Sequence, residues 1–148
     1  MFRIKVEHIV EKEIEHVFDV ITDHVNYKNF PGIDKSILLE EGVSERNGEG
    51  ALRIIGAGLF ELKERITHFE RPSKMHYQIE ASSPIAMRHD KGEITLEPVG
   101  DNTRVLWVSE GHMNVPLIGN LLLDKIIEMK ITKSFQHILN AIERTRVA

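Results

Sequence analysis

The chain has 148 residues, a formal net charge of −4, 41% hydrophobic residues and no cysteine. This size and apolar content predict a single domain with a substantial core, and the acidic balance argues against a nucleic-acid partner, because such proteins carry a basic excess. The lack of cysteine excludes disulfides and thiolate chemistry; with charged residues in the first strand in place of a signal peptide or membrane span, it favours a cytoplasmic protein without stable membrane insertion.

The first predicted elements are a strand and a short helix. Apolar and charged residues alternate from Phe2 to Val10, which is the pattern of a strand with one buried face. From Glu13 the apolar spacing lengthens to that of a helix, which ends near Asp23 after about two to three turns. The next segment, 24–33, is polar and aromatic and carries the turn signal Pro31-Gly32, so we expect either a second short helix or a loop over an opening.

The middle of the chain is predicted to form about six strands in three hairpins. These strands span Ser36 to Val43, Gly50 to Ile55, Leu59 to Glu70, Lys74 to Ser82, Met87 to Pro98 and Thr103 to Met113. Asn47-Gly48 is expected to supply the positive φ of the first turn. In the third hairpin, the turn length pairs Ile94 with Trp107, and a bulge near Gly92 would decide which residue of 88–90 points inward.

The second hairpin is predicted to carry a carboxylate on its inner face. A four-residue loop would pair Ile66 with Ile79 and Glu64 with Ala81. The alternation along both strands also puts His68 and His76 on opposite faces. The inner face then collects Phe60, Leu62, Glu64, Ile66, Tyr77 and Ile79.

The last predicted element is one long helix from Val115 to Arg146, a rod of roughly 45 Å. Its apolar stripe consists of Leu123, Ile127, Ile131, Phe135, Ile138 and Ile142, with Leu121 and Leu139 at the edge. Near the helix start apolar residues lie all round, which predicts burial on more than one side or contact with an apolar partner. Asp124 and Glu128 fall within the stripe, so either the helix bends near 119–120 or both carboxylates face an interior space.

Together these elements predict an α+β fold, in which about seven antiparallel strands form a curved sheet around the C-terminal helix, with one or two short helices after the first strand. Residues 1–148 are expected to form one domain. Several segments carry a family resemblance, namely EIEHVFDVITDHVNYKNFPG, ERNGEGALRIIGAG, FELKERITHFERPSKMHYQIEASSP, NTRVLWVS and the closing helix. Over essentially its whole length the chain resembles the helix-grip fold of the START-like (SRPBCC) superfamily, nearest to its polyketide cyclase/dehydrase-like subgroup. The resemblance implies a ligand-binding domain whose cavity, between sheet and helix, holds an apolar molecule.

The candidate ligand-binding residues follow from the predicted inner face and the rim of that cavity. They are Phe30, Phe60, Leu62, Glu64, Tyr77, Ile79, Met87, Arg88, Trp107, Met113, Leu121 and Ile127. Glu64 and His89 are the candidate catalytic residues, because a desolvated carboxylate or an imidazole can move protons. A bulge could instead turn Glu64 to solvent, or an arginine, Arg53 or Arg88, could pair with it.

Alternative interpretations remain open for the other candidates. Arg88 and His89 could bind an anionic head group at the cavity rim, or be solvated strand residues. Tyr77 and Trp107 could stack on a flat ligand, or simply fill the core.

Metal and cofactor sites are not expected. The eight histidines are too scattered to supply the three or four converging ligands that zinc requires. No nucleophile elbow, phosphate loop or dinucleotide fingerprint is present, so nucleophilic catalysis and nucleotide cofactors are not predicted.

Three functions are compatible with these predictions. The first is binding or transport of a hydrophobic small molecule such as a lipid, quinone or polyketide, without chemistry. The second is a cyclase, aromatase or dehydratase that folds a flexible poly-carbonyl chain in the cavity. The third is partner binding, including a homodimer, through the outer residues Leu106 and Val108 or through the leucine-rich helix start.

Overall fold

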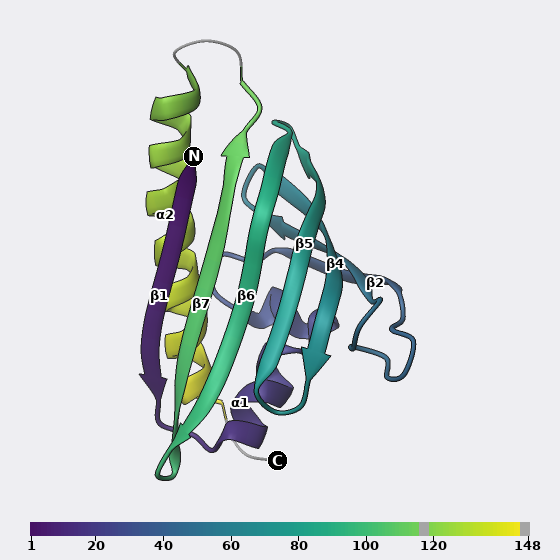
Figure 1. The fold of residues 1–148 in the computed structure, drawn as a ribbon, viewed down its shortest axis with the longest axis vertical. Helices are drawn as coiled ribbons and strands as arrows, with labels where there is room; N and C mark the ends of the chain where they lie inside the picture. Colours follow the sequence, from purple (N-terminus) through teal and green to yellow (C-terminus); the bar gives the residue numbers. More distant parts are fainter. Residues whose placement is uncertain (116–118, 146–148) are drawn as a thin grey trace.

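The computed structural model of the chain describes residues 1–115 and 119–145, which form a seven-stranded antiparallel sheet and a long helix. The strands are β1 (Phe2–Val10), β2 (Lys35–Glu40), β3 (Leu52–Ala57), β4 (Phe60–Glu70), β5 (Lys74–Ser83), β6 (Met87–Val99) and β7 (Asn102–Met113). The helices are α1 (Ile14–Ile21), the 3₁₀ helix η1 (His24–Asn29) and α2 (Gly119–Glu143). The strand order is β1-β7-β6-β5-β4-β3-β2 (Figure 1), which confirms the predicted fold class.

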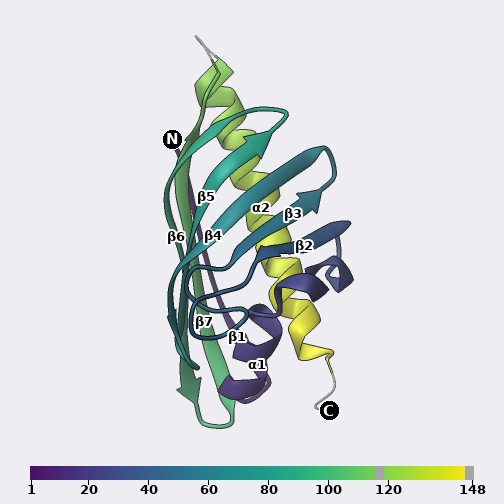
Figure 2. The same cartoon turned by 90° about the vertical axis from the view of Figure 1, so that its right-hand side faces the viewer.

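The sheet curves around α2, and the core lies between them (Figure 2). Inward-facing residues of β1 alternate with exposed charged residues, as predicted, because only one face of the strand meets the core. The predicted stripe of α2 is buried at Ile127, Phe135, Ile138 and Ile142. Short helix α1 packs beside the C-terminal part of α2, where it covers that end of the core.

The register predicted for the third hairpin is confirmed, whereas that for the second is wrong. Ile94 pairs with Trp107, as expected. In the second hairpin Ile66 pairs with Tyr77, and Glu64 pairs with Ile79. The register differs because Glu70 pairs with Lys74, which leaves a three-residue loop, and because an irregularity between Ile66 and His68 shifts the pairing again. Before this irregularity the inward-facing residues of β4 are even-numbered, such as Glu64 and Ile66, and after it the inward-facing residue is Phe69.

Because of the irregularity between Ile66 and His68, the prediction for two histidines is also wrong. His68 and His76 pair directly, with ring centroids 5.2 Å apart, and do not lie on opposite faces. Phe69 instead turns toward the core, where its ring lies 5.1 Å from that of Phe18. In the described part of the chain, no group of three or more acidic, histidine or cysteine side chains is placed to hold a metal ion.

The first hairpin has a longer connection than predicted. Strand β2 ends at Glu40, before the predicted Val43, and the positive φ falls at Gly50 (93°), not at Gly48. The connection is held by its own backbone hydrogen bonds, with the N–H of Val43 donating to the carbonyl of Glu49 at 2.9 Å. These bonds replace the strand ladder there.

Strands β5 and β6 pair only at one end of their common length. Ladder pairs join them at Lys74–His76 and do not continue beyond His76. Side chains bridge the gap, since the N–H of Ile79 donates to Nδ1 of His89 at 3.1 Å and the Gln78 amide donates to the His89 carbonyl. The register shift in β6 falls between His89 and Lys91, close to the bulge predicted near Gly92.

The two carboxylates predicted to lie within the stripe of α2 bind main-chain groups of the sheet. Asp124 is buried and accepts a hydrogen bond from the N–H of Met113 at 2.9 Å, as well as one from the N-terminal ammonium. Glu128 accepts one from the N–H of Arg3 at 3.2 Å. Residues 116–118 and 146, which the predicted helix included, lie outside the described residues. Among the described residues, no helix has the length and apolar character needed to cross a bilayer.

Candidate functional site

A small cavity lies between α2 and the concave face of the sheet. Its volume is about 100 Å³. The sheet side is lined mainly by apolar residues that the two-residue period of the strands turns inward, and α2 contributes residues at helical spacing. The apolar lining consists of Phe2, Ile33, Ile55, Ala57, Leu62, Ile79, Met87, Trp107, Ile131, Phe135 and Ile138.

Trp107 and Phe135 form an aromatic wall of this cavity. Trp107 comes from the inner face of β7 and Phe135 from α2, and their rings stack with centroids 3.9 Å apart and planes at 12°. Both side chains are nearly inaccessible to solvent. Because Trp107 is the one tryptophan of the chain, any spectroscopic signal from tryptophan reports on this cavity.

An ion pair, Arg53 of β3 with Glu64 of β4, also lines the cavity. The two residues pair across the strands, and their side chains face inward. Nε of Arg53 donates to Oε1 of Glu64 at 2.9 Å, and the Arg53 Nη2 lies 2.8 Å from the same oxygen. The guanidinium also lies 4.5 Å over the ring of Tyr27. Burial alone would lower the pKa of Arg53, but the charge of Glu64 raises it above its usual value, so Arg53 stays charged in the ion pair.

His24 completes this first network in a neutral state. Its Nε2 lies 2.8 Å from the carbonyl oxygen of Asn47, which can only accept a hydrogen bond, so Nε2 carries the proton. Nδ1 then accepts from Nη1 of Arg53 at 3.0 Å. Burial, followed by the charge of Arg53, lowers the pKa of His24 to about 3. We call Arg53, Glu64, His24 and Tyr27 the arginine network.

A second network, which we call the tyrosine network, consists of His89, Ser109, Trp107 and Tyr77. Nε2 of His89 lies 3.0 Å from Oγ of Ser109, and Nε1 of Trp107 donates to the hydroxyl of Tyr77 at 2.9 Å. The rings of Tyr77 and His89 stack 5.5 Å apart. Burial lowers the pKa of His89 to about 4, while burial and the charge of Glu64 raise the pKa of Tyr77 above its usual value. Both side chains are therefore neutral near pH 7.

The candidate residues occupy different parts of the structure. Those that line the cavity are Leu62, Glu64, Tyr77, Ile79, Met87 and Trp107. His89 is buried behind Tyr77, and the pairing of Glu64 with Arg53 was one of the alternatives left open. Phe60 is half-buried beside the core, while Met113 and Ile127 are buried outside the cavity lining.

Three candidates lie away from the cavity. Arg88 is exposed and pairs with Asp90 at 3.2 Å, which favours the solvated-strand interpretation. Leu121 is 75% exposed, since it lies on the side of α2 away from the sheet. Phe30 lines a different pocket, described below. The cavity residues that the sequence did not single out include Tyr27, Ser109 and Ser134; for Ser109, its inward position on β7, two residues after Trp107, was the available signal.

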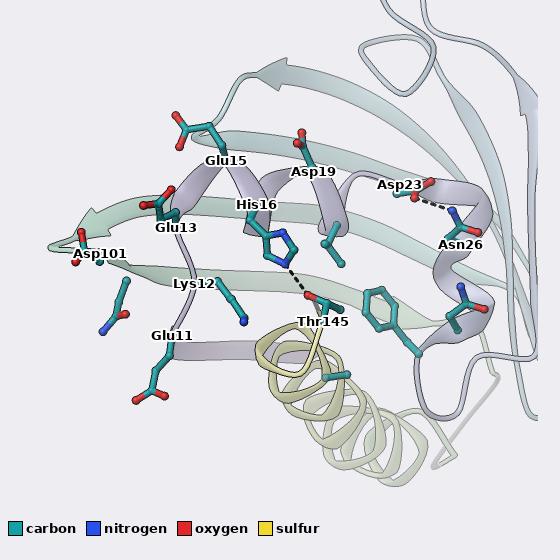
Figure 3. A pocket seen from close by; sticks show the side chains of 15 residues that line it. Glu11, Lys12, Glu13, Glu15, His16, Asp19, Asp23, Asn26, Asp101 and Thr145 are labelled. Atoms are coloured by element: carbon teal, nitrogen blue, oxygen red, sulfur yellow. Dashed lines mark hydrogen bonds between the residues drawn. The ribbon is translucent and has the colours of Figure 1, made fainter. Parts of the chain in front are cut away.

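A larger groove of about 1060 Å³ lies outside the core, where α1 approaches the end of α2. Most of its charged side chains are acidic, and Glu11 and Glu15 point away from each other (Figure 3). His16 bonds Thr145 there, with 2.6 Å between Nε2 and Oγ1. Solvated, divergent carboxylates do not suit an apolar ligand, so the cavity under α2 is the candidate site.

Comparisons with known proteins agree with this architecture. A family model described as "Polyketide cyclase / dehydrase and lipid transport" matches residues 1–145. A START superfamily protein from Mycobacterium smegmatis has a TM-score of 0.75 at 12% identity, covering 97% of this chain and 96% of that one. The Zhui aromatase/cyclase from Streptomyces sp. R1128 has a TM-score of 0.74 at 16% identity, covering 96% and 93%. A comparison with curated proteins found no match.

Proposed function

Because the chain belongs to the polyketide cyclase/dehydrase and lipid transport family, we propose that it binds an uncharged hydrophobic small molecule between the sheet and α2. The observation that carries the proposal is the cavity beneath α2, whose apolar lining includes the stacked rings of Trp107 and Phe135. Binding pockets for small molecules are mostly apolar, with a few placed polar groups, and this cavity has that composition.

The charges on the cavity wall support an uncharged ligand. Arg53 and Glu64 neutralise each other at 2.8 Å, so neither offers a free charge to an ionic head group. A charged ligand would have to lose its hydration shell without a partner of opposite sign, which is costly in an apolar space. Lipid, quinone and polyketide-like molecules all meet the requirement for a neutral, apolar body.

The volume of the cavity limits what fits without rearrangement. At about 100 Å³ it is smaller than an engineered cavity of roughly 150 Å³ that binds benzene. It is also well below the roughly 300–1,000 Å³ of drug-sized sites. A ligand of the size of benzene or larger therefore requires α2 and the sheet to move apart.

Binding can be tested with variants of Ser134, a half-buried residue on the α2 wall of the cavity. Ser134→Phe should fill the space and weaken binding of a one-ring hydrocarbon such as α-methylstyrene at least about tenfold, whereas Ser134→Ala should leave it nearly unchanged. The indole N–H resonance of Trp107 provides the readout. Unchanged binding to folded Ser134→Phe would place the ligand elsewhere and reject the proposal.

Catalysis of the cyclase, aromatase or dehydratase kind is the alternative, and the position of Glu64 on the cavity wall favours it. A carboxylate in reach of a bound poly-carbonyl chain could act as a base. Against this, Glu64 is held by Arg53 and both ring nitrogens of His89 have partners. Glu64→Gln, shown to be folded by circular dichroism, should abolish turnover but retain ligand affinity if Glu64 is the base. Unchanged turnover would reject that role.

A homodimer remains a proposal supported by exposed apolar side chains of α2. Leu121, Leu122 and Met129 are 75%, 67% and 66% exposed. Exposed apolar residues gathered on one helix are a common feature of association surfaces. Light scattering over a dilution series should show a concentration-dependent mass that Leu122→Ser lowers; a constant monomer mass would refute self-association.

A further inference from the structure

The hydrogen bonds of the tyrosine network run in one direction. The N–H of Ile79 donates to Nδ1 of His89 at 3.1 Å, so Nδ1 carries no proton. Because neutral imidazole holds one ring proton, that proton is on Nε2 and is donated to Oγ of Ser109, 3.0 Å away. Ser109 accepts this bond, and its own hydroxyl proton remains available for another acceptor.

The chain of donors converges on the hydroxyl oxygen of Tyr77. The indole N–H of Trp107 is a donor only, and it donates to this oxygen at 2.9 Å. The Ser109 hydroxyl is also within hydrogen-bonding reach of the same oxygen. Tyr77 therefore accepts a hydrogen bond from Trp107, and among the described residues its own O–H proton can reach only the oxygen of Ser109. When Ser109 donates to Tyr77 instead, the Tyr77 proton is left for a ligand.

The polar groups of the arginine network on the cavity wall are already engaged. The hydroxyl of Tyr27 donates to the carbonyl of Ile21. Arg53 donates to Glu64 and His24. An unengaged donor on a largely apolar wall determines which ligand atom is recognised, because a polar ligand atom placed there must be able to accept.

We propose that the O–H of Tyr77 is the polar anchor of the cavity and donates a hydrogen bond to an uncharged acceptor oxygen of the ligand, such as a ketone, quinone or ester carbonyl. This inference rests on the proposed function, since it presupposes a ligand in the cavity. A hydroxyl group on the ligand gains less, because its donor finds no free acceptor on the Tyr77 side. A carboxylate is disfavoured, because Arg53, the cation on the wall, is already paired.

The test uses two probes of nearly the same shape, acetophenone and α-methylstyrene, which differ by a carbonyl oxygen in place of a methylene. Their affinities are measured by titrating the indole N–H resonance of Trp107. Wild-type protein should bind the ketone about three- to tenfold more tightly, the size expected for one neutral hydrogen bond. Tyr77→Phe should remove this preference while still binding the hydrocarbon.

The control is Ser134→Ala, which removes a hydroxyl from the opposite wall. It should keep the ketone preference, and loss of that preference in Ser134→Ala would assign the anchor to Ser134. A second readout needs no variant, because the ¹³C resonance of the ketone carbonyl should move downfield on binding to wild type, as hydrogen bonding predicts.

The outcomes separate this inference from the proposed function. Equal binding of both probes to wild type, or a preference that survives in Tyr77→Phe, overturns the role of Tyr77 but leaves a hydrophobic cavity that binds ligands. Failure of both probes to bind contradicts the proposed function as well.

Discussion

The cavity wall carries two polar networks that differ in whether every donor has a partner. In the arginine network, Arg53 donates to Glu64 and His24, and Tyr27 donates to a main-chain carbonyl. In the tyrosine network, Trp107 donates to Tyr77, and the Tyr77 proton is left for a ligand when Ser109 also donates to Tyr77. A network in which every donor is already bonded has no donor left for a ligand. We therefore expect the arginine network to stabilise the fold and the tyrosine network to contribute to ligand recognition.

The two networks also differ in charge. The arginine network buries a cation and an anion, and such pairs are expensive to break although they add little to stability when intact. The tyrosine network contains only neutral groups near pH 7. Substitutions in the first network should therefore act on folding, and those in the second on ligand preference.

The largest effect is expected from breaking the buried ion pair. Glu64→Leu leaves the guanidinium of Arg53 buried without a partner and should lower the free energy of unfolding by about 3–5 kcal/mol in urea titrations. The double variant Arg53→Met, Glu64→Leu should recover most of this loss. If the double variant is as unstable as the single one, the ion pair is not the source of the effect.

Lowering the pH should destabilise the protein through both buried histidines. Their folded pKa values, about 3 for His24 and about 4 for His89, lie below the ordinary histidine value of 6.5. Below pH 6.5 these two histidines bind protons in the unfolded chain but not in the folded chain, so the free energy of unfolding falls as the pH falls. Each histidine should cost about 2 kcal/mol between pH 6.5 and 5.

The pH effect is checked by urea unfolding at both pH values. His24→Gln should flatten the pH dependence, because it removes one of the two buried imidazoles. A profile that stays equally steep in His24→Gln would contradict the proposed neutral, buried state.

Gly92 tests how closely the tyrosine network is packed. A Cβ at this position would lie 2.6 Å from the main-chain oxygen of Tyr77, 2.7 Å from Cε1 of His89 and 2.8 Å from Cε2 of Tyr77. Gly92→Ala should therefore cost about 1–3 kcal/mol by overpacking, as measured by urea unfolding. Lys91→Ala, at an exposed neighbour on the same strand, should change stability by less than about 0.5 kcal/mol. An equal effect of both changes would show that the strand and not the packing is responsible.

The smallest expected effects separate the two tyrosines. Tyr27→Phe and Tyr77→Phe each remove one hydroxyl and should each lower stability by only about 1–2 kcal/mol in urea titrations. Their effects on binding should differ, since only Tyr77→Phe should change the preference for a ketone over a hydrocarbon. Equal changes in the ketone preference of both variants would contradict the proposed difference between the two networks.

Most of the fold could be predicted from the sequence because its strands alternate regularly. The β6–β7 register near the turn followed from the regular alternation of β6 after Gly92 and from a short turn. The β4–β5 register did not, since the loop is one residue shorter than predicted and the irregularities of β4 leave no mark in the pattern of apolar residues. Local periodicity determines which face a residue occupies, whereas long-range pairing decides its partner.

The candidate site was predictable only in part for the same reason. The inward position of Glu64 follows from alternation, but its pairing with Arg53 depends on the β3–β4 register. Leu121 shows the complementary case: a helical wheel places it at the edge of the stripe, but it is 75% exposed. Burial on a helix depends on the opposing surface, which periodicity does not describe.

Ladder pairs between β5 and β6 stop at His76, so β1-β7-β6 and β5-β4-β3-β2 share few main-chain hydrogen bonds, although the short connection from Ser83 to Met87 joins the two strands again at the other end. Along this seam side chains take the place of ladder bonds, so we expect the main-chain amides of β5 that face β6 to exchange with deuterium faster than the amides bonded between β6 and β7. The seam should therefore loosen first in its middle, while both of its ends stay joined.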